Sequence, residues 1–337
     1  MKDLKIVFAD SILPISDHER RIIHDFGCEV TQYHAITPKE ILEVAHDADA
    51  ILTVGGKFTR ETIEGLEKCK VIARYGVGYD NVDIKAATEK GIVVTYVPVY
   101  CQEEVATLAL TLMLACSRRI MIADRCVKAG RWAKSVASVS GAASPRGKVF
   151  GLVGFGSIAR QVVPLIKPLG VRVIAYDPYI NLDFCRELGV ESVELDELLE
   201  ISDYVSLHVP LMDSTRHMIA APQLHRMKKT AILINTGRGG LVDQDALCEA
   251  LKDGTIAAAG LDVLEYEPPR EYEEIFTLDN CITTGHIAAA TEEAIVRLRC
   301  AAATSLVQVL SGIKPSLPSG IANPDVLQKV PLKDAGE

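Results

Sequence analysis

The chain has 337 residues, of which 48% are apolar and 24% are charged, and its formal net charge at pH 7 is −9. These are the values of an ordinary globular protein of about two domains, so they exclude a disordered or collagen-like chain. An acidic chain without a block of Lys and Arg is also a poor candidate for nucleic-acid binding.

The first residues, with Asp3 and Asp10 on either side of a short apolar run, predict a buried strand rather than a signal peptide. The longest apolar stretch, Val105–Cys116, is too short to cross a bilayer, which needs about 20 residues, so we expect no membrane association. The nine cysteines are scattered, without a Cys-x-x-Cys pair. This usage predicts reduced thiols in the cytoplasm and neither a disulfide framework nor a metal site.

The first hundred residues alternate short apolar runs with helical patterns, which predicts a parallel sheet covered on both faces. The expected strands are Leu4–Ala9, Glu29–Tyr33, Ala50–Val54, Val71–Tyr75 and Ile92–Val97, with helices near His18–Phe26, Pro38–His46, Arg60–Lys68 and Asp83–Lys90.

A long helical segment is expected from about Gln102 to Gly130, and the Gly and Pro residues that follow at Gly141–Gly147 are typical of a linker. A second series of strands and helices then begins at Lys148. Its expected strands are Val149–Val153, Val171–Tyr176, Tyr204–Val209, Ala231–Asn235, Ala257–Val263 and Cys281–Thr284. A last helix is expected at Glu292–Leu310, and the Pro- and Gly-rich residues after it should be extended.

A glycine-rich turn, Gly154-Phe-Gly156-Ser157-Ile158-Ala159, directly follows the strand Val149–Val153 and opens a helix. Gly154 permits the tight turn, Gly156 lets the backbone approach a pyrophosphate, and the small third residue allows helix and strand to pack closely. The first helical N–H groups and the positive end of the helix dipole favour phosphates. This context predicts a dinucleotide site rather than an ordinary strand-to-helix turn.

Asp177 follows the next expected strand, at the distance from the turn where a carboxylate accepts hydrogen bonds from ribose hydroxyls. The same carboxylate would repel a 2′-phosphate. The sequence therefore predicts NAD rather than NADP as the cofactor.

Three further expected strands run into polar segments that contain Arg238, Glu267 and His286. Ligands of open α/β sheets bind at the carboxyl ends of strands, so these side chains could meet in one cleft. Each residue alone has a structural explanation, as a surface charge, a solvated loop acid or a core histidine. Together the three residues are a far more specific indication of a functional site than any one of them alone.

At this point the chain resembles the NAD-dependent D-isomer-specific 2-hydroxyacid dehydrogenases, over nearly its whole length. The segments that carry the resemblance are Lys70–Asp83, Gly151–Gly156, Asn235–Asp243, Gly260–Val263, Glu267-Pro268 and His286–Ala288.

The resemblance implies roles for these residues. Arg238 would bind the carboxylate of a small unphosphorylated 2-oxo or (R)-2-hydroxy acid, His286 would be the general acid/base, and Glu267 would tune His286. Thr236 and Asp262 would contribute to cofactor binding, Asp262 at the nicotinamide carboxamide. Arg74, Val77, Gly78 and Tyr100 would bind substrate, and Tyr75 hints with Val77 and Tyr100 at a partly apolar substrate. The family mechanism contains no metal.

The chain also departs from the family pattern. Gly285 stands before His286 where relatives usually have Pro, Ser157 replaces a common Arg, and Tyr96 precedes Val97-Pro98 where Asn is common. The segment Thr53–Gly56 lacks the Arg-Ser pair that phosphoglycerate-oxidising relatives offer to phosphate, and we expect the chain to be too short for the regulatory domain of some of them. Lys57 is the nearest replacement cation.

We therefore predict an α/β fold of two Rossmann-like or flavodoxin-like domains with parallel sheets. Residues 102–287 would form the NAD-binding domain, inserted into a discontinuous substrate domain of residues 1–101 and 288–337. The apolar helix near Val105–Cys116 resembles the element through which the family forms homodimers; the alternative is an interdomain core helix, and the helix could serve both purposes. Alternative functions are an NADH-sensing, protein-binding scaffold like the C-terminal-binding corepressors and, less favoured because Glu267 replaces Gln, a formate-type dehydrogenase.

Overall fold

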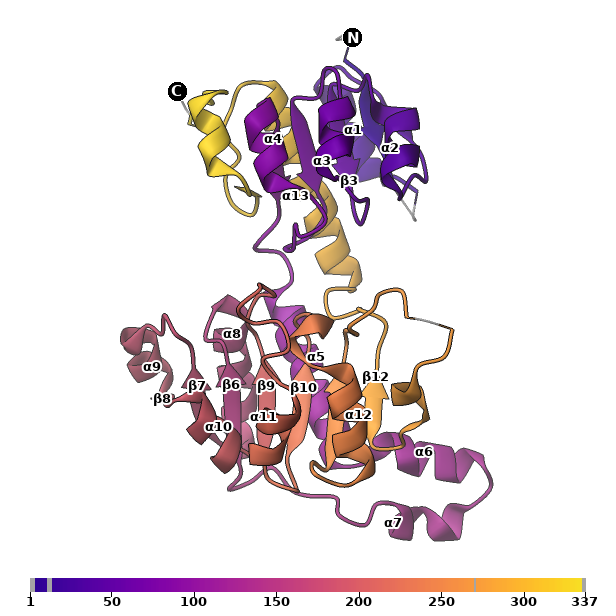
Figure 1. Cartoon of the computed structure of the whole chain (residues 1–337), viewed down its shortest axis with the longest axis vertical. Coiled ribbons are helices and arrows are strands. Elements are labelled where there is room, and N and C mark those ends of the chain that lie inside the picture. The colour runs from indigo at the N-terminus through magenta and orange to yellow at the C-terminus, as the bar shows by residue number, and fades with distance from the viewer. Residues whose placement is uncertain (1–3, 11–13, 270, 335–337) are drawn as a thin grey trace. The chain divides into compact units, whose positions relative to one another are not determined.

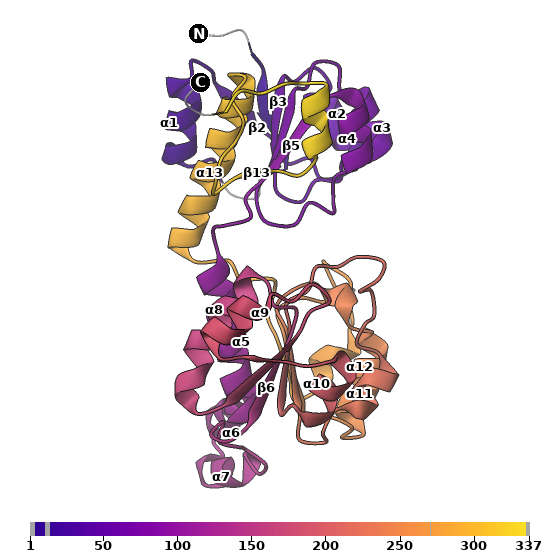
Figure 2. The same cartoon turned by 90° about the vertical axis from the view of Figure 1, so that its left-hand side faces the viewer.

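A computed structural model describes residues 4–10, 14–269 and 271–334 (Figure 1, Figure 2). The chain divides into two compact units. The first unit combines Met1–Tyr100 with Thr291–Glu337, and the second is Cys101–Ala290. Within each unit a mostly parallel sheet carries helices on both faces, which confirms the predicted α/β class.

The first unit contains a six-stranded sheet whose order is β13-β5-β4-β3-β1-β2. Helices α1 and α13 cover one face, and α2, α3 and α4 cover the other (Figure 2). Its elements are β1 (Ile6–Phe8), α1 (Asp17–Asp25), β2 (Val30–Gln32), α2 (Pro38–Ala45), β3 (Ala50–Thr53), α3 (Arg60–Gly65), β4 (Val71–Arg74), α4 (Ile84–Lys90), β5 (Val93–Tyr96), α13 (Glu292–Leu310), β13 (Gly320–Ile321) and the 3-10 helix η5 (Pro324–Gln328).

Local chemistry explains where these helices begin. Ser16 and Thr37 each cap a helix with the side-chain oxygen, and Glu19 and Glu40 complete reciprocal capping boxes three residues later. The extended tail was predicted without a strand, but Gly320–Ile321 pairs antiparallel with β5. The first sheet is therefore mostly parallel, with one antiparallel edge strand that the sequence did not indicate because two residues are too few to give a periodic pattern.

Tyr75 lies inside the first unit. Its side chain is 5% exposed, and its hydroxyl donates a hydrogen bond to Glu19 Oε1 (2.5 Å), whose other oxygen accepts from Arg299 Nη1 (3.0 Å). Burying the Glu19 carboxylate is tolerable because these donors compensate for its lost hydration. The interpretation of Tyr75 as a substrate-lining side chain is therefore wrong.

The second unit contains a seven-stranded sheet in the order β12-β11-β10-β9-β6-β7-β8, and every pairing in it is parallel. Its strands are β6 (Val149–Val153), β7 (Arg172–Tyr176), β8 (Glu191–Ser192), β9 (Tyr204–Leu207), β10 (Ile232–Asn235), β11 (Ala258–Leu261) and β12 (Cys281–Thr283). Its helices are α5 (Gln102–Ser117), α6 (Ile120–Lys128), η1 (Trp132–Lys134), α7 (Ser135–Ser138), α8 (Ser157–Ile166), η2 (Lys167–Leu169), α9 (Leu182–Leu188), α10 (Leu195–Ile201), α11 (Ala221–Arg226), η3 (Gly239–Leu241), α12 (Gln244–Lys252) and η4 (Glu274–Thr277).

The helical segment predicted from Gln102 to Gly130 is divided into two helices, α5 and α6. Arg119 adopts a left-handed backbone conformation (φ 51°), which ends α5 and redirects the chain into α6. No single helix in the described ranges is long and apolar enough to cross a membrane, although the bent pair of α5 and α6 passes by length and composition together. Residues 141–147 form a loop between α7 and β6 inside the second unit.

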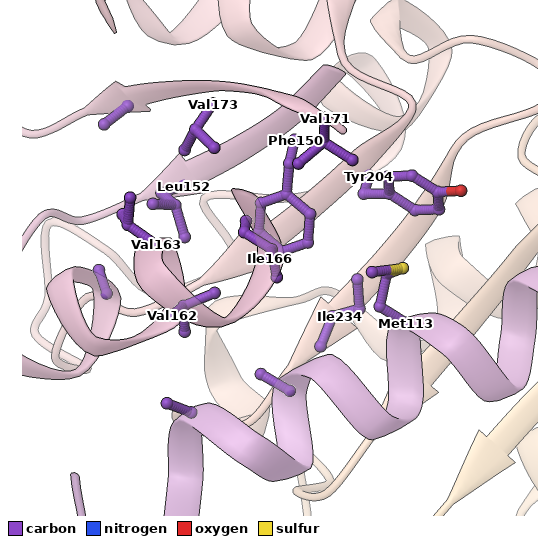
Figure 3. Packing of buried hydrophobic residues seen from close by; sticks show 14 of the residues in the cluster. Met113, Phe150, Leu152, Val162, Val163, Ile166, Val171, Val173, Tyr204 and Ile234 are labelled. Atoms are coloured by element: carbon purple, nitrogen blue, oxygen red, sulfur yellow. The ribbon is translucent and has the colours of Figure 1, made fainter. Parts of the chain in front are cut away.

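Helix α5 packs into the core of the second unit (Figure 3). Met113 points toward Ile234 and Tyr204 of the sheet, while Val162 and Ile166 of α8 contact the same cluster around Phe150. Several apolar α5 residues between Val105 and Cys116 are buried, so this helix forms part of the core of the second unit.

Candidate active site

The glycine-rich turn joins β6 to α8 in the predicted conformation. Gly154 has φ +91°, and a Cβ at this position would lie 2.8 Å from the backbone carbonyl carbon of His208. Any larger residue would therefore be strained and would also collide with the segment that follows β9. Buried Ala159 then packs α8 against the sheet.

The edge beyond this turn has room for a pyrophosphate. A Cβ on Gly156 would meet no atom within 4 Å, and no side chain caps the N-terminus of α8, which begins with Ser157 and Ile158. Strands β6 and β9 are neighbours although β7 and β8 lie between them in sequence, so this edge is the topological switch point of the sheet. Such an edge, with free N–H groups at a ten-residue helix, is where open α/β sheets bind dinucleotides.

Asp177 follows β7, at the same edge. Its Oδ2 accepts a hydrogen bond from the N–H of Phe155 (2.8 Å) and its Oδ1 accepts one from the N–H of Tyr179 (2.8 Å). A carboxylate oxygen has two lone pairs, so each oxygen keeps one for a ribose hydroxyl. The carboxylate thus braces the glycine-rich turn and is also suited to ribose binding.

Thr236 follows β10. Its side chain is 8% exposed, and its hydroxyl oxygen has no hydrogen-bond partner in the described structure. A buried hydroxyl without a partner is costly and is found at sites that receive a ligand. Together with the open space at Gly156, this orphaned group shows that the second unit fits a dinucleotide.

His286 and Glu267, the predicted acid/base and its partner, form a hydrogen-bonded pair. His286 Nδ1–H donates to Glu267 Oε2 (2.7 Å), because an ionised carboxylate only accepts. Glu267 Oε1 accepts from the N–H of Leu264 (3.0 Å). This arrangement leaves Nε2 as the ring nitrogen of His286 that is available to a substrate, and the His286 side chain is 50% exposed.

The pKa of Glu267 is set by opposing effects. Burial raises this pKa, but the hydrogen bond and charge of His286, the Leu264 N–H and the charge of Arg238 outweigh burial, so the pKa lies below its ordinary value of 4.5. Glu267, His286 and Arg238 therefore share one electrostatic environment.

Asp262 holds the loop that carries His286. It is 1% exposed, and its carboxylate accepts hydrogen bonds from the hydroxyl of Thr284 (2.5 Å) and the N–H groups of Ile287 and Ala288 (both 2.9 Å). The N–H of His286 donates to the Asp262 carbonyl oxygen (2.7 Å). The role of Asp262 toward the nicotinamide stays a prediction, whereas its contacts here orient the loop. Sequence reasoning missed Thr284. The available signal was Asp262, because an acid directly after an apolar strand needs nearby hydrogen-bond donors.

Arg238 lies in a turn fixed by a second residue that sequence reasoning missed. Asn235, 1% exposed, donates through Nδ2 to the Arg238 carbonyl oxygen (2.8 Å) and accepts from the N–H of Gly237 (3.0 Å). Strands β10, β11 and β12 are consecutive in the sheet, so the segments that bear Arg238, Glu267 and His286 leave one edge side by side.

The predicted substrate residues Arg74, Val77, Gly78 and Tyr100 all belong to the first unit. Arg74 ends β4 and donates to the Tyr75 carbonyl oxygen (2.6 Å), and the Val77 side chain is 38% exposed in the following loop. Tyr100 follows the neighbouring strand β5, and its ring packs partly buried against the core. The structure thus gathers these residues at one sheet edge, and their contact with substrate stays a prediction.

His208 follows β9 and lies near the glycine-rich turn. Burial lowers the pKa of His208 to about 4, which leaves this imidazole neutral and hydrogen-bonded to Ser206 (2.9 Å). In the described parts of the chain, no three His, Cys, Asp or Glu side chains are grouped so that they could hold a metal ion.

Comparison with known proteins gives a consistent result. Residues 110–288 match the D-isomer specific 2-hydroxyacid dehydrogenase, NAD binding domain. A glyoxylate reductase of Korarchaeum cryptofilum is 41% identical, covering 87% of this chain and 88% of that protein. A D-3-phosphoglycerate dehydrogenase of Methanocaldococcus jannaschii is 43% identical over 92% of this chain, which spans only 58% of that relative. A D-lactate dehydrogenase structure from Aquifex aeolicus, complexed with NAD and lactic acid, has a TM-score of 0.82 and 28% identity, covering 91% and 96% of the two chains.

The lowered pKa of Glu267 predicts a pH-dependent stability difference. A carboxyl whose pKa is lower in the folded protein stabilises the fold above its ordinary value of 4.5, and this contribution disappears as the pH falls through the lowered pKa. Glu267→Gln should therefore lower the melting temperature near neutral pH, and the difference should shrink as the pH falls below 4.5 and through the lowered pKa of Glu267. Thermal unfolding of both proteins across this range measures the effect, and a difference independent of pH would contradict it.

Proposed function

The chain belongs to the D-isomer specific 2-hydroxyacid dehydrogenases, a family of NAD-dependent oxidoreductases, and we propose that it reduces a small unphosphorylated 2-oxo acid to an (R)-2-hydroxy acid, or catalyses the reverse oxidation. The observation that carries this proposal is the hydrogen bond from His286 to Glu267, on a loop that buried Asp262 holds beside the Arg238 turn.

The reaction uses these residues as follows. NAD, bound in the reduced form, supplies the hydride that the carbonyl carbon of the substrate accepts. His286 gives the proton at Nε2 to the carbonyl oxygen, and Glu267 stabilises the imidazolium through Nδ1 until then. The planar guanidinium of Arg238 binds the substrate carboxylate and polarises the carbonyl. In the reverse direction neutral His286 takes the hydroxyl proton.

The proposed cofactor residues and the predicted substrate residues Arg74, Val77, Gly78 and Tyr100 lie in different units. Residues 102–287 would bind NAD through Gly154, Gly156, Ser157, Ile158, Asp177, Thr236 and Asp262. Residues 1–101 and 288–337 would supply Arg74, Val77, Gly78 and Tyr100 to the substrate.

The loop after β3 supports an unphosphorylated substrate. Thr53–Gly56 contains no cationic side chain, and the first one that follows is Lys57. The curated relatives that this chain spans most fully include glyoxylate reductases and a hydroxypyruvate reductase, named for small unphosphorylated acids. All nine cysteines are free thiols, which fits a reducing compartment such as the cytoplasm.

A homodimer is part of the proposal. Several exposed apolar side chains lie on α6, η1 and α7, which project beyond the sheet of their unit (Figure 1). They are Ile120, Met121, Val127, Trp132 and Val136. The buried face of α5 is used by the core, so the dimer contact would extend over this projecting segment.

The first prediction concerns substrate and cofactor. Absorbance at 340 nm should fall with NADH and one or two acids from a panel of glyoxylate, pyruvate, hydroxypyruvate, 2-oxoisocaproate and phenylpyruvate. NADPH should give little turnover, because Asp177 repels a 2′-phosphate. 3-Phosphohydroxypyruvate is the matched control and should react poorly. Turnover with none of these acids, despite tight NADH binding, would contradict the proposal and favour an NADH-sensing scaffold.

The second prediction concerns His286. His286→Ala should lower kcat by about two to four orders of magnitude, which is the usual contribution of a positioned acid/base. NADH binding, followed by its fluorescence, should persist because the glycine-rich turn is untouched. The exposed His225 on α11 provides the control substitution His225→Ala, which should retain full turnover. Unchanged turnover of His286→Ala would remove the role given to this residue.

The third prediction concerns assembly. Light scattering at micromolar concentration should give twice the chain mass of 36.6 kDa. Joint substitution of Trp132 and Val136, which are 76% and 81% exposed, by Gln should shift the protein toward monomer, whereas Leu182→Gln, at an exposed apolar residue of α9, should not. A monomer in the unsubstituted protein would disprove the dimer.

A further inference from the structure

The structure contains a second hydrogen-bonded pair of a histidine and a glutamate, and its glutamate lies two residues before Glu267 in the chain. His217 Nε2–H donates to Glu265 Oε1 (2.7 Å), and Glu265 precedes Glu267 in the loop after β11. The Glu265 side chain is 15% exposed and that of His217 is 39% exposed. The proposed reaction uses neither residue, so this well-formed contact needs another explanation.

The backbone of His217 is held in an unfavourable conformation. Its φ is +51°, and among the described non-glycine residues only Arg119 and His286 share a positive φ. The His217 N–H donates to the Gly240 carbonyl oxygen (2.8 Å), and Ile219 pairs in the same way with Leu241 (3.1 Å). Such strain persists where surrounding contacts fix it, and here the contacts connect His217 to the segment directly after Arg238.

Glu265 has further partners that fix its loop. Its N–H donates to Gln244 Oε1 (3.2 Å), and its Oε2 accepts from the N–H of Gln244 (3.4 Å). The Gln244 side chain also donates to Glu273 (2.9 Å), farther along the same connection. The loop is therefore attached to the first turn of α12 as well as to His217.

The loop also touches the Arg238 turn, backbone to backbone. A Cβ on Gly239 would lie 1.8 Å from the carbonyl oxygen of Leu264 and 2.5 Å from the nitrogen of Glu265. There is no free space between the two segments, so a shift of Glu265 must displace either the Arg238 turn or the residues that lead to Glu267.

We propose that His217 and Glu265 are positioning residues for the catalytic groups, an inference that rests on the proposed function. Their hydrogen bond holds the loop so that Glu267 contacts His286 Nδ1. It also keeps the loop in close contact with the Arg238 turn, which packs against the loop through the backbone of Gly239. Neither residue touches the reacting atoms. The same loop thus supplies Glu265 to His217 and Glu267 to His286.

The test separates the side-chain contact from the backbone strain. His217→Asn retains a residue that tolerates a positive φ, but its amide is too short to replace Nε2 at Glu265. We expect kcat with the best 2-oxo acid to fall about tenfold to one-hundredfold, because a small displacement of catalytic groups has this effect. NADH affinity should stay unchanged, and the KM for the acid should rise because the Arg238 turn shifts.

Matched variants test the mechanism of the loss. His217→Gln, whose amide nitrogen reaches the position of Nε2, should recover most of the activity, and His225→Ala should have none of the defect. Glu265→Ala also removes the acceptor of the Gln244 N–H, so it should lose at least as much activity as His217→Asn, and the double variant should be no worse than Glu265→Ala alone because the shared hydrogen bond is already absent. Additive losses or normal kcat in His217→Asn, with the fold intact by circular dichroism, would overturn the proposal.

A readout independent of turnover distinguishes this proposal from the proposed function. The imidazole NMR signal of His286, assigned by its loss in His286→Ala, should change its shift and its pH titration in His217→Asn and recover them in His217→Gln. If no 2-oxo acid is reduced but this pattern appears, the positioning role stands and the reaction must be revised. An unchanged His286 signal and titration in His217→Asn would overturn the positioning role whatever the reaction.

Discussion

The hydrogen bonds of the buried Asp262 carboxylate are the interactions on which the proposed catalytic edge of the second unit depends. A carboxylate that is 1% exposed must find hydrogen-bond donors to offset its lost hydration, and it finds three of them in Thr284, Ile287 and Ala288. Satisfying this one buried charge therefore fixes the loop that bears His286, and it holds that residue in a left-handed conformation at φ +56°.

The chemistry of the edge follows from strand order. Because β10, β11 and β12 are consecutive, the segments with Arg238, Glu267 and His286 emerge side by side, while the glycine-rich turn lies two strands away from β10 across the switch point at β9 and β6. The residues proposed for cofactor binding and for acid/base chemistry in this unit thus follow strands of one sheet at the same edge. The hydrogen bonds that Glu265 makes with His217 and Gln244 also attach the loop after β11 to its neighbours.

The sequence predicted the regular elements well where apolar runs were long. The central strands and the helix Glu292–Leu310 match their expected ranges, since a buried strand or a long amphipathic helix has a strong periodic signal. It did not show where a single backbone angle divides a segment, as at Arg119, whose left-handed conformation separates the expected helical segment into two helices. It also did not indicate β13, because a strand of two residues is defined only by its partner β5.

The sequence by itself determined the family, the α/β class and the residue types of the site, because the glycine-rich turn and the segments around Arg238, Glu267 and His286 are local patterns. Only the tertiary structure decided that Tyr75 is buried against Glu19 and that Asp262 clamps the His286 loop. It alone also joined His217 to Glu265, 48 residues apart. The physical reason is that hydrogen bonds between distant segments depend on how strands are ordered in the sheet, and no local pattern of residues records that order.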